Sequence, residues 1–142
     1  MLVVRPARIN DVEAIKAIDH IAPIDDGRVN YIRTAVADGR THILLLQGDA
    51  IGYGIIEHHF FGHTFIELVY LREDVRENGY GPFLMKSLES MAVTEKIFTS
   101  TNRSNERMRH VLEREGWQES GTIDNLDEGD PEIVYCKMAS TI

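Results

Sequence analysis

The spacing of apolar residues divides the N-terminal part of the chain into one short strand and two helices. Residues 2–5, LVVR, predict a strand that a following proline ends. Apolar residues then recur at helical spacing over residues 12–18, and Asn10 with an acid three positions on is typical of a capping box. A second helix begins near Asp25, and Gly39 lies just past its end, where glycine commonly terminates a helix.

From residue 41 the apolar period changes to two, which is typical of strands. Gly48 and Asp49 form a two-residue hairpin signal between the first two of these strands. The strands predicted in this part of the chain are residues 41–47, 50–60, 64–71, 95–101, 117–123 and 132–138.

Two helices separate the later strands. One has Leu84, Leu88 and Met91 on its inner face, and the other begins after Asn105 and ends at Gly116. A helix between the fourth and fifth strands permits a parallel pair, whereas hairpins make the other neighbours antiparallel. We therefore predict the α/β (α+β) class, with a mixed, mostly antiparallel sheet of about seven strands flanked by about four helices.

The composition narrows the class of protein. A chain of 142 residues has the usual size of one domain, so residues 1–142 are expected to share one core. The net charge of −8 argues against a nucleic-acid partner and is compatible with a cationic substrate, although solubility is the simpler explanation. The N-terminal apolar run is too short for a signal peptide or a membrane span, and the lone cysteine, Cys136, fits a reducing cytoplasm.

The segment RENGYG, residues 76–81, follows a predicted strand and opens a helix. The first turn of a helix presents unpaired N–H groups and a partial positive charge, and glycine lets an anion approach the backbone. Arg76 adds a cation that can bind phosphate through paired donors, and Pro82 is tolerated in a first helical turn. The segment therefore favours a phosphate-bearing ligand, with a tight strand-to-helix turn as the alternative. It has neither the Gly-Lys-Ser/Thr ending of a P-loop nor the three glycines of a dinucleotide fingerprint.

The same six residues resemble the acetyl-CoA-binding motif of the GNAT superfamily of N-acetyltransferases, Q/R-x-x-G-x-G/A. The strand TFIELVYL lies where the family has the strand before that motif. In the later segment SNERMRHVLEREGW, Asn105 is followed eleven residues on by Gly116 and then by Trp117, as in the family's later helix. The order of elements also agrees along essentially the whole chain, so the sequence is identified as a member of this superfamily.

The resemblance implies where acetyl-CoA binds. In GNAT proteins the strand before the motif splays from the next strand, and the pantetheine arm lies in the gap. Main-chain groups at the end of that strand are expected to bind the pantetheine and the acetyl carbonyl, and the loop amides with the arginine are expected to hold the diphosphate. The helix-terminal asparagine is expected to contact the cofactor, with purely local bonding as the alternative. The cofactor-binding residues implied are Val69, Tyr70, Leu71, Arg76, Glu77, Asn78, Gly79, Tyr80, Gly81 and Asn105.

The reaction that the resemblance implies is direct attack of an amine on the thioester. Glu67 resembles the acid that many family members carry on this strand, and it is our candidate for removing the amine proton, with a solvent-facing role as the alternative. A backbone N–H from Val69 or its neighbour is expected to stabilise the oxyanion. Many relatives have a tyrosine proton donor seven residues after the helix's Asn, but this chain has Leu112. Tyr135 and His110 are candidate replacements, with packing or surface roles as the alternative.

Two other groups of polar residues are candidates for a metal site or a substrate-binding site. His58, His59 and His63 suggest a metal site, but adjacent strand residues point to opposite faces and no cysteine lies nearby, so no metal is expected. The acidic segment over residues 124–132 lacks the spacing of a calcium loop. It is either a solvated connection or an acidic rim that attracts amines.

These features predict an acetyl-CoA-dependent N-acetyltransferase that acts on a primary amine of a small or cationic molecule. The alternatives are a non-catalytic acyl-CoA-binding domain, which Leu112 favours, and a protein acetyltransferase that modifies a lysine or an N-terminal amine. A homodimer is possible, because dimers are frequent among GNAT proteins. The acceptor depends on loop shape and does not follow from the fold.

Overall fold

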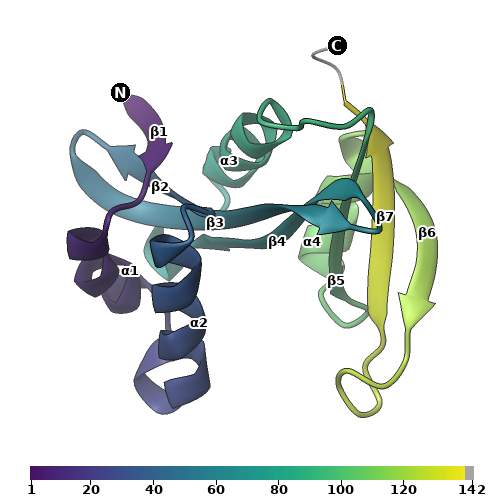
Figure 1. Ribbon diagram of the computed structural model, residues 1–142, viewed down its shortest axis with the longest axis horizontal. Coiled ribbons are helices and arrows are strands. Elements are labelled where there is room, and N and C mark those ends of the chain that lie inside the picture. The colour runs from purple at the N-terminus through teal and green to yellow at the C-terminus, as the bar shows by residue number, and fades with distance from the viewer. Residues whose placement is uncertain (140–142) are drawn as a thin grey trace. The chain divides into compact units, whose positions relative to one another are not determined.

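The computed structural model describes residues 1–139, which form seven β-strands, four α-helices and three short 3₁₀ helices (Figure 1). The strands are β1 (Leu2–Pro6), β2 (Thr41–Leu46), β3 (Asp49–Phe60), β4 (His63–Leu71), β5 (Lys96–Asn102), β6 (Gln118–Ile123) and β7 (Glu132–Met138). The α-helices are α1 (Val12–Ile18), α2 (Asp26–Ala37), α3 (Tyr80–Glu89) and α4 (Glu106–Arg114). The 3₁₀ helices are η1 (Ile9–Asp11), η2 (Ala22–Ile24) and η3 (Glu73–Val75).

In the part of the chain that the structure describes, the seven strands are hydrogen-bonded in the order β1-β2-β3-β4-β5-β7-β6. The β1–β2, β2–β3, β5–β7 and β6–β7 pairs are antiparallel. β4 and β5 run parallel and pair through residues 64–66 and 97–99, as expected for strands connected by a helix. The predicted mixed, mostly antiparallel sheet flanked by four helices is therefore confirmed for residues 1–139.

Main-chain packing divides the structure into two compact units, each made of separate stretches of the chain. The first unit contains Met1–Ile56 and Leu68–Leu88, and the second contains Glu57–Glu67 and the residues from Glu89 on. The chain passes from one unit to the other within β3, within β4 and at the end of α3. That residues 1–142 form a single domain stays a prediction.

In the first unit, α1 and α2 cover one face of the strands and α3 covers the other (Figure 1). Ile15 of α1 and Ile32 of α2 are fully buried in one core with Tyr53 of β3. On the opposite face, a Cβ atom at Gly54 of β3 would lie 2.5 Å from Leu88 Cδ1. Glycine at this strand position therefore lets α3 pack closely on the sheet.

In the second unit, α4 contacts β7 through Arg109, whose Nε donates to the Tyr135 hydroxyl at 3.4 Å. Leu112 of α4, Ile97 of β5 and Tyr135 of β7 are all fully buried. Lys137 of β7 bonds to Glu89 at 2.9 Å. β6 lies at the edge of the sheet and is exposed along its whole length.

The predicted cap of the first helix was wrong. Asn10 lies inside η1, and the side chain of Asp11 accepts the N–H of Arg8 at 2.7 Å. Arg5 donates to the same carboxylate at 2.8 Å. The Asp11 side chain, and not the Asn10 amide, therefore makes the hydrogen bonds at this helix start. α1 then begins at Val12.

Two element ends also differ from the sequence prediction. The first hairpin turns at Gln47 and Gly48, both at positive φ, which is one residue before the predicted pair. α3 ends at Glu89, so Met91 lies beyond the helix whose inner face it was predicted to extend. The predicted start of α2 is confirmed, because Asp25 accepts the N–H of Gly27 at 2.8 Å as the N-cap.

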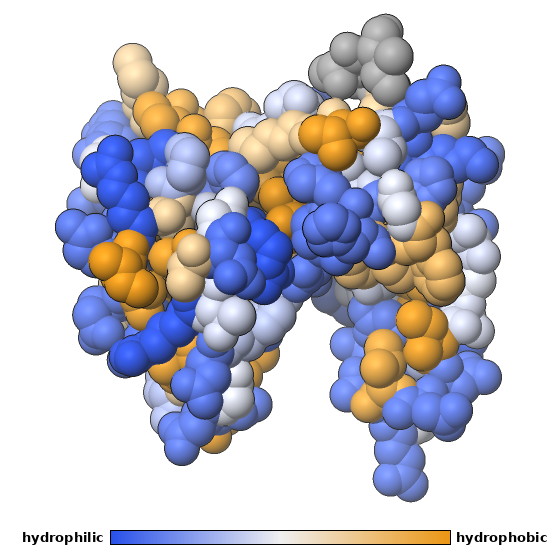
Figure 2. All heavy atoms as spheres, in the orientation of Figure 1, coloured by the Kyte–Doolittle hydropathy of each residue, from blue (hydrophilic) through white to orange (hydrophobic). Residues whose placement is uncertain are grey.

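Hydrophilic residues cover most of the face shown in Figure 2, with exposed hydrophobic side chains in scattered patches. Such a distribution is usual for a protein surface. Among residues 1–139, no helix combines the length and the apolar character needed to cross a membrane.

Candidate functional site

The chain turns from β4 into α3 through a short loop with a left-handed backbone at two positions. After η3, Glu77 has a φ of 70° and Gly79 a φ of 82°. Glycine takes this conformation without the steric cost that a side chain brings. A Cβ atom at Gly79 would meet nothing within 4 Å, so the glycine is needed for the turn itself and not for space around it.

The first turn of α3 presents main-chain donors beside this bend. The N–H of Phe83 donates to the carbonyl of Gly79 at 3.2 Å, which starts the helix. Helical geometry therefore offers no intrahelical acceptor to the N–H groups of Tyr80 and Gly81, and Pro82 has no N–H. Because these donors carry the positive end of the helix dipole, the helix start suits an anion such as a phosphate.

Two further contacts hold the loop in shape. The side-chain amide of Asn78 donates to the carbonyls of Val75 (3.0 Å) and Arg76 (3.2 Å). A Cβ atom at Gly81 would lie 3.4 Å from Leu71 Cδ1, so this glycine lets α3 begin close to the end of β4. The Asn78 side chain therefore stabilises the loop through these two hydrogen bonds. The main-chain N–H of Asn78 remains a candidate contact with the cofactor.

The guanidinium of Arg76 is held from two sides. Its Nε donates to the carbonyl of Leu71 at 3.2 Å, and its central carbon lies 5.2 Å from the centre of the Tyr70 ring. Neither contact uses Nη1 or Nη2, the nitrogens that bind phosphate as a pair. The first unit thus contains both parts of the predicted phosphate site, the guanidinium of Arg76 and the main-chain amides at the start of α3.

The end of β4 contains the residues expected to bind the pantetheine arm. The parallel ladder with β5 ends at Ile66, whose carbonyl accepts a hydrogen bond from the Thr99 hydroxyl at 2.8 Å. Beyond it, Val69 is half-buried and Tyr70 is buried. The carbonyl of Leu71 is already engaged by the arginine described above. Binding of the cofactor by main-chain groups of these last three residues stays a prediction.

Asn105 lies in the second unit, at the start of α4. Its Oδ1 accepts the N–H of Met108 at 3.2 Å and caps the helix. Asp130 fixes the loop before it by accepting both the N–H (3.0 Å) and the hydroxyl (2.6 Å) of Ser104. Asn105 therefore has the local role that was the alternative to cofactor binding, and its contact with the cofactor remains an expectation.

The candidate catalytic residues have different surroundings. Glu67 is half-buried on β4, beside the fully buried Ile66. Tyr135 is fully buried, and its hydroxyl accepts a hydrogen bond from Arg109 Nε at 3.4 Å. A buried hydroxyl reaches a departing thiolate only if its neighbours move, so the geometry favours packing for Tyr135. Leu112 is fully buried as well, and catalytic roles for Glu67 and Tyr135 stay predictions.

Part of the acidic segment over residues 124–132 serves local structure. Three of its carboxylates accept hydrogen bonds from the end of β5 and the loop after it: Asp127 from Asn102, Asp130 from Ser104 and Glu132 from Ser100. Asp124 and Glu128 are exposed. The neutral Asn and Ser donors leave these carboxylates charged, so Asp127, which is also exposed, can contribute with these two residues to an acidic rim.

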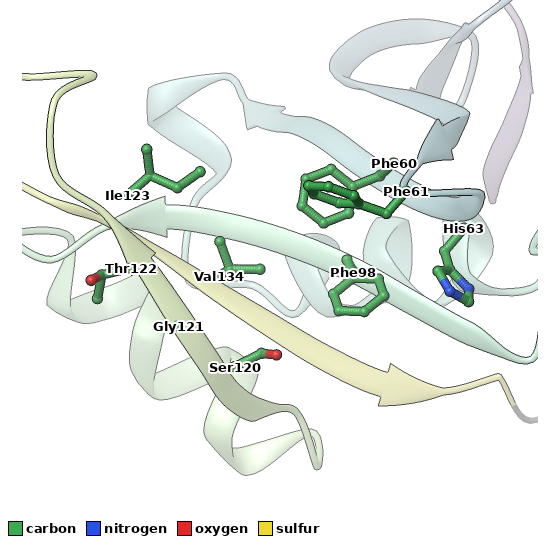
Figure 3. Close-up of a pocket in the computed structure, with 9 residues that line it drawn as sticks. All are labelled: Phe60, Phe61, His63, Phe98, Ser120, Gly121, Thr122, Ile123 and Val134. Atoms are coloured by element: carbon green, nitrogen blue, oxygen red, sulfur yellow. The ribbon is translucent and has the colours of Figure 1, made fainter.

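A mainly apolar hollow of about 470 Å³ lies in the second unit (Figure 3). Phe60 stacks on Phe65 with 4.4 Å between ring centres and lies 5.3 Å from Phe98. Among the described residues that line the hollow, none is a carboxylate. It therefore suits an apolar group better than an ammonium ion.

The three neighbouring histidines have separate surroundings. Nδ1 of His58 bonds to the Thr64 hydroxyl at 2.8 Å, His59 is exposed, and His63 lines the hollow with its ring 5.6 Å from Phe98. Within residues 1–139, no three His, Cys, Asp or Glu side chains gather as they would around a metal ion.

A buried polar cluster in the first unit was missed in the sequence. Asp19 directly follows α1 and accepts hydrogen bonds from Arg28 Nε (2.9 Å) and from the Tyr53 hydroxyl. The ring of Tyr53 stacks on Tyr70, whose hydroxyl accepts the N–H of His20 at 3.1 Å. A charged residue at a helix end is usually solvated, so the sequence carried no signal that Asp19 is only 1 % exposed.

The cluster shifts two pKa values. Burial raises the pKa of Asp19, but the hydrogen bonds from Tyr53, the Ile21 N–H and Arg28 outweigh it and bring the pKa below its ordinary value. Burial and the bond to Asp19 both raise the pKa of Tyr53 well above that of a free tyrosine. Asp19 is therefore a carboxylate paired with a cation and a neutral phenol at pH 7.

Comparison with known proteins identifies the family. The model of the acetyltransferase (GNAT) family matches residues 10–117. A crystal structure of a GNAT-family acetyltransferase from Bacillus cereus ATCC 10987 is 37% identical, with a TM-score of 0.88 and 97% of each chain covered. The chain belongs to the acetyltransferase (GNAT) family, and the predicted family and fold are confirmed. Membership supports acetyltransferase activity with acetyl-CoA as the co-substrate.

More distant solved structures share the fold. Ard1 from Thermoplasma volcanium is 12% identical, with a TM-score of 0.80 and 97% of each chain covered. A protein of Bacillus anthracis str. Ames assigned as a streptothricin acetyltransferase, in complex with acetyl coenzyme A, is 14% identical with a TM-score of 0.77, covering 97% of this chain and 99% of that one. No curated protein matches the chain.

The Asp19 cluster predicts acid-sensitive stability. Because the folded pKa of Asp19 is depressed, its contribution is present above the unfolded value of about 4 and is lost as the pH falls through the folded pKa. Asp19→Asn should lower the free energy of unfolding at pH 7 by about 3–5 kcal/mol, since it leaves the Arg28 charge buried without its partner. Urea unfolding at several pH values measures both effects.

A matched control is Asp74→Asn, which removes an exposed carboxylate paired with Arg72. This variant should unfold like the wild type at every pH. Equal stability of the Asp19→Asn variant and the wild type at pH 7 would contradict the structural role of the cluster.

Proposed function

We propose that the protein is an acetyl-CoA-dependent N-acetyltransferase that transfers the acetyl group to a primary amine of a small molecule. The observation that carries the proposal is the helix start at Gly79, where donor amides and the held guanidinium of Arg76 occur together. This combination of fixed donors and a fixed cation suits the diphosphate of coenzyme A.

The cofactor-binding residues divide by the part of acetyl-CoA that they would hold. Main-chain amides over residues 77–81, with Arg76, bind the diphosphate, and main-chain groups over residues 69–71 bind the pantetheine. Acetyl-CoA supplies an acetyl group activated as a thioester. The protein holds the thioester and the amine in a fixed relative orientation. Ordering the two reactants in this way can account for much of the rate enhancement.

Glu67 removes the proton from the attacking amine, directly or through a water molecule. The N–H of Val69 or its neighbour donates to the oxyanion. Leu112 cannot donate a proton, and the buried Tyr135 is poorly placed to do so. A thiol pKa near the model value of about 8.5 makes the thiolate a fair leaving group, so water can protonate it.

The acceptor is a primary amine, and two features bear on its chemistry. Asp124 and Glu128 remain exposed in the acidic segment and would attract a cation. The hollow in the second unit would favour an apolar body. We therefore expect a small amine that carries an apolar group, and the lone cysteine is compatible with a cytoplasmic location.

Leu112 favours one alternative, a domain that binds acyl-CoA without turnover. Incubation with acetyl-CoA and a panel of small amines and peptides, followed by detection of free thiol, separates the hypotheses. Turnover of small amines supports the proposal, and turnover of peptides alone indicates a protein acetyltransferase. Tight binding of coenzyme A without turnover of any amine indicates a non-catalytic acyl-CoA-binding domain.

The role of Arg76 predicts a loss of cofactor affinity. Arg76→Ala should weaken coenzyme A binding by about 1.5–3 kcal/mol, because a charge-assisted contact with the diphosphate is removed. Isothermal titration calorimetry measures the change. Arg33→Ala, on an exposed face of α2, is the control and should bind as the wild type does. Unchanged affinity of the Arg76→Ala variant would show that this arginine does not bind the cofactor.

The role of Glu67 predicts a separation of turnover from binding. Glu67→Gln should lower kcat about 10²- to 10⁴-fold, the usual effect of losing a general base, while the Kd for coenzyme A stays the same. The shape of the pH–rate profile should also change. A variant that keeps both the wild-type rate and the wild-type profile would exclude Glu67 as the base.

A further inference from the structure

The side chain of Tyr70 contacts both Arg76, in the loop before α3, and the core of the first unit. Tyr70 is only 7 % exposed and belongs to the core formed with α1 and α2. The guanidinium carbon of Arg76 lies 5.2 Å from the ring centre, and that of Arg28 lies 5.9 Å from it. A cation within about 6 Å of an aromatic face is attracted by the ring quadrupole.

The ring of Tyr70 is itself fixed in place. It stacks on Tyr53 with 5.9 Å between ring centres and an interplanar angle of 27°. Its hydroxyl accepts the main-chain N–H of His20 at 3.1 Å and also contacts the imidazole of that residue. Tyr53 in turn bonds to Asp19. The ring is therefore a rigid surface under the arginine, held by residues on β3 and after α1.

We propose that the Tyr70 side chain is a positioning residue for cofactor binding, whose ring face holds the Arg76 guanidinium so that Nη1 and Nη2 are free for the diphosphate. This inference rests on the proposed function. The carbonyl of Leu71 fixes Nε, and the ring fixes the plane of the guanidinium. An arginine that is ordered before the ligand arrives loses less conformational entropy on binding than a mobile one.

The proposal differs from a purely packing role in what it predicts for ring electronics. Fluorine atoms on a phenylalanine ring weaken the quadrupole while they change the shape of the ring little. A packing role depends on shape, whereas attraction of a guanidinium depends on the negative face of the ring. Fluorinated rings therefore separate the two without removing a core side chain.

The experiment places phenylalanine, and phenylalanine with one, two or three fluorine atoms, at position 70 and measures the Kd of coenzyme A by calorimetry. Tyr70→Phe is the reference for the series, because it keeps the ring face and has already lost the hydroxyl that contacts His20. The Kd should then rise with each fluorine, by about two- to thirtyfold over the series. Thermal melts of each variant establish that it is folded.

Two controls isolate the contact. The same series at Tyr31, a half-buried ring of α2 packed against the same core, should leave the Kd of coenzyme A unchanged. In an Arg76→Ala background the Kd of coenzyme A should not change over the series at position 70, because the guanidinium that the ring is proposed to position for the diphosphate is gone. Pantetheine, which lacks the diphosphate, should bind all variants alike.

The outcomes distinguish this inference from the function beneath it. A flat series at position 70, with Arg76→Ala still weakening coenzyme A, overturns the positioning role and leaves the proposed function standing. A graded series that persists in the Arg76→Ala background also overturns the positioning role. If Arg76→Ala itself has no effect on the Kd, the arginine does not bind the diphosphate and the positioning role fails, whereas the proposed function still stands or falls with turnover of the amine panel.

Discussion

The left-handed turn at Gly79 is the constraint on which the site depends. Gly79, with φ at 82°, is the last residue of the connection from β4, and α3 begins at the next residue, Tyr80. A residue with a side chain would strain this backbone by about 1–2 kcal/mol. The turn determines where the amides of Tyr80 and Gly81 lie, and therefore where an anion can be bound. Arg76 and the strand end are arranged around this point.

Burial and charge then fix the surroundings of the turn. Arg76 is a long side chain that would sample many rotamers in solvent, yet its Nε and its planar face are both engaged. The supporting ring of Tyr70 is linked through Tyr53 to the buried carboxylate of Asp19. A buried ion pair contributes little net stability, but losing one partner is costly. The main role of the cluster is therefore to fix the position of the Tyr70 ring, and not to add net stability.

The sequence predicted the order of elements, the parallel pair and the family because these depend on local periodicity and on a motif with fixed spacing. It failed where tertiary contacts override local signals. Asn10 has the residue type of a cap, but the Asp11 carboxylate pairs with Arg5 and organises the helix start instead. Asp19 looks like a solvated helix end and is buried, because Tyr53 and Arg28, distant in the sequence, converge on it. Glu77 takes a left-handed conformation that its residue type does not signal.

The central claim, that the α3 helix start binds the diphosphate of coenzyme A, is tested most directly by amide chemical shifts. In ¹⁵N-labelled protein titrated with coenzyme A, the amides of Gly79, Tyr80 and Gly81 should move downfield together and saturate at the Kd found by calorimetry. Gly39 and Gly62, at left-handed turns elsewhere, should not move. Saturable binding of coenzyme A with unshifted resonances at residues 79–81 would contradict the account.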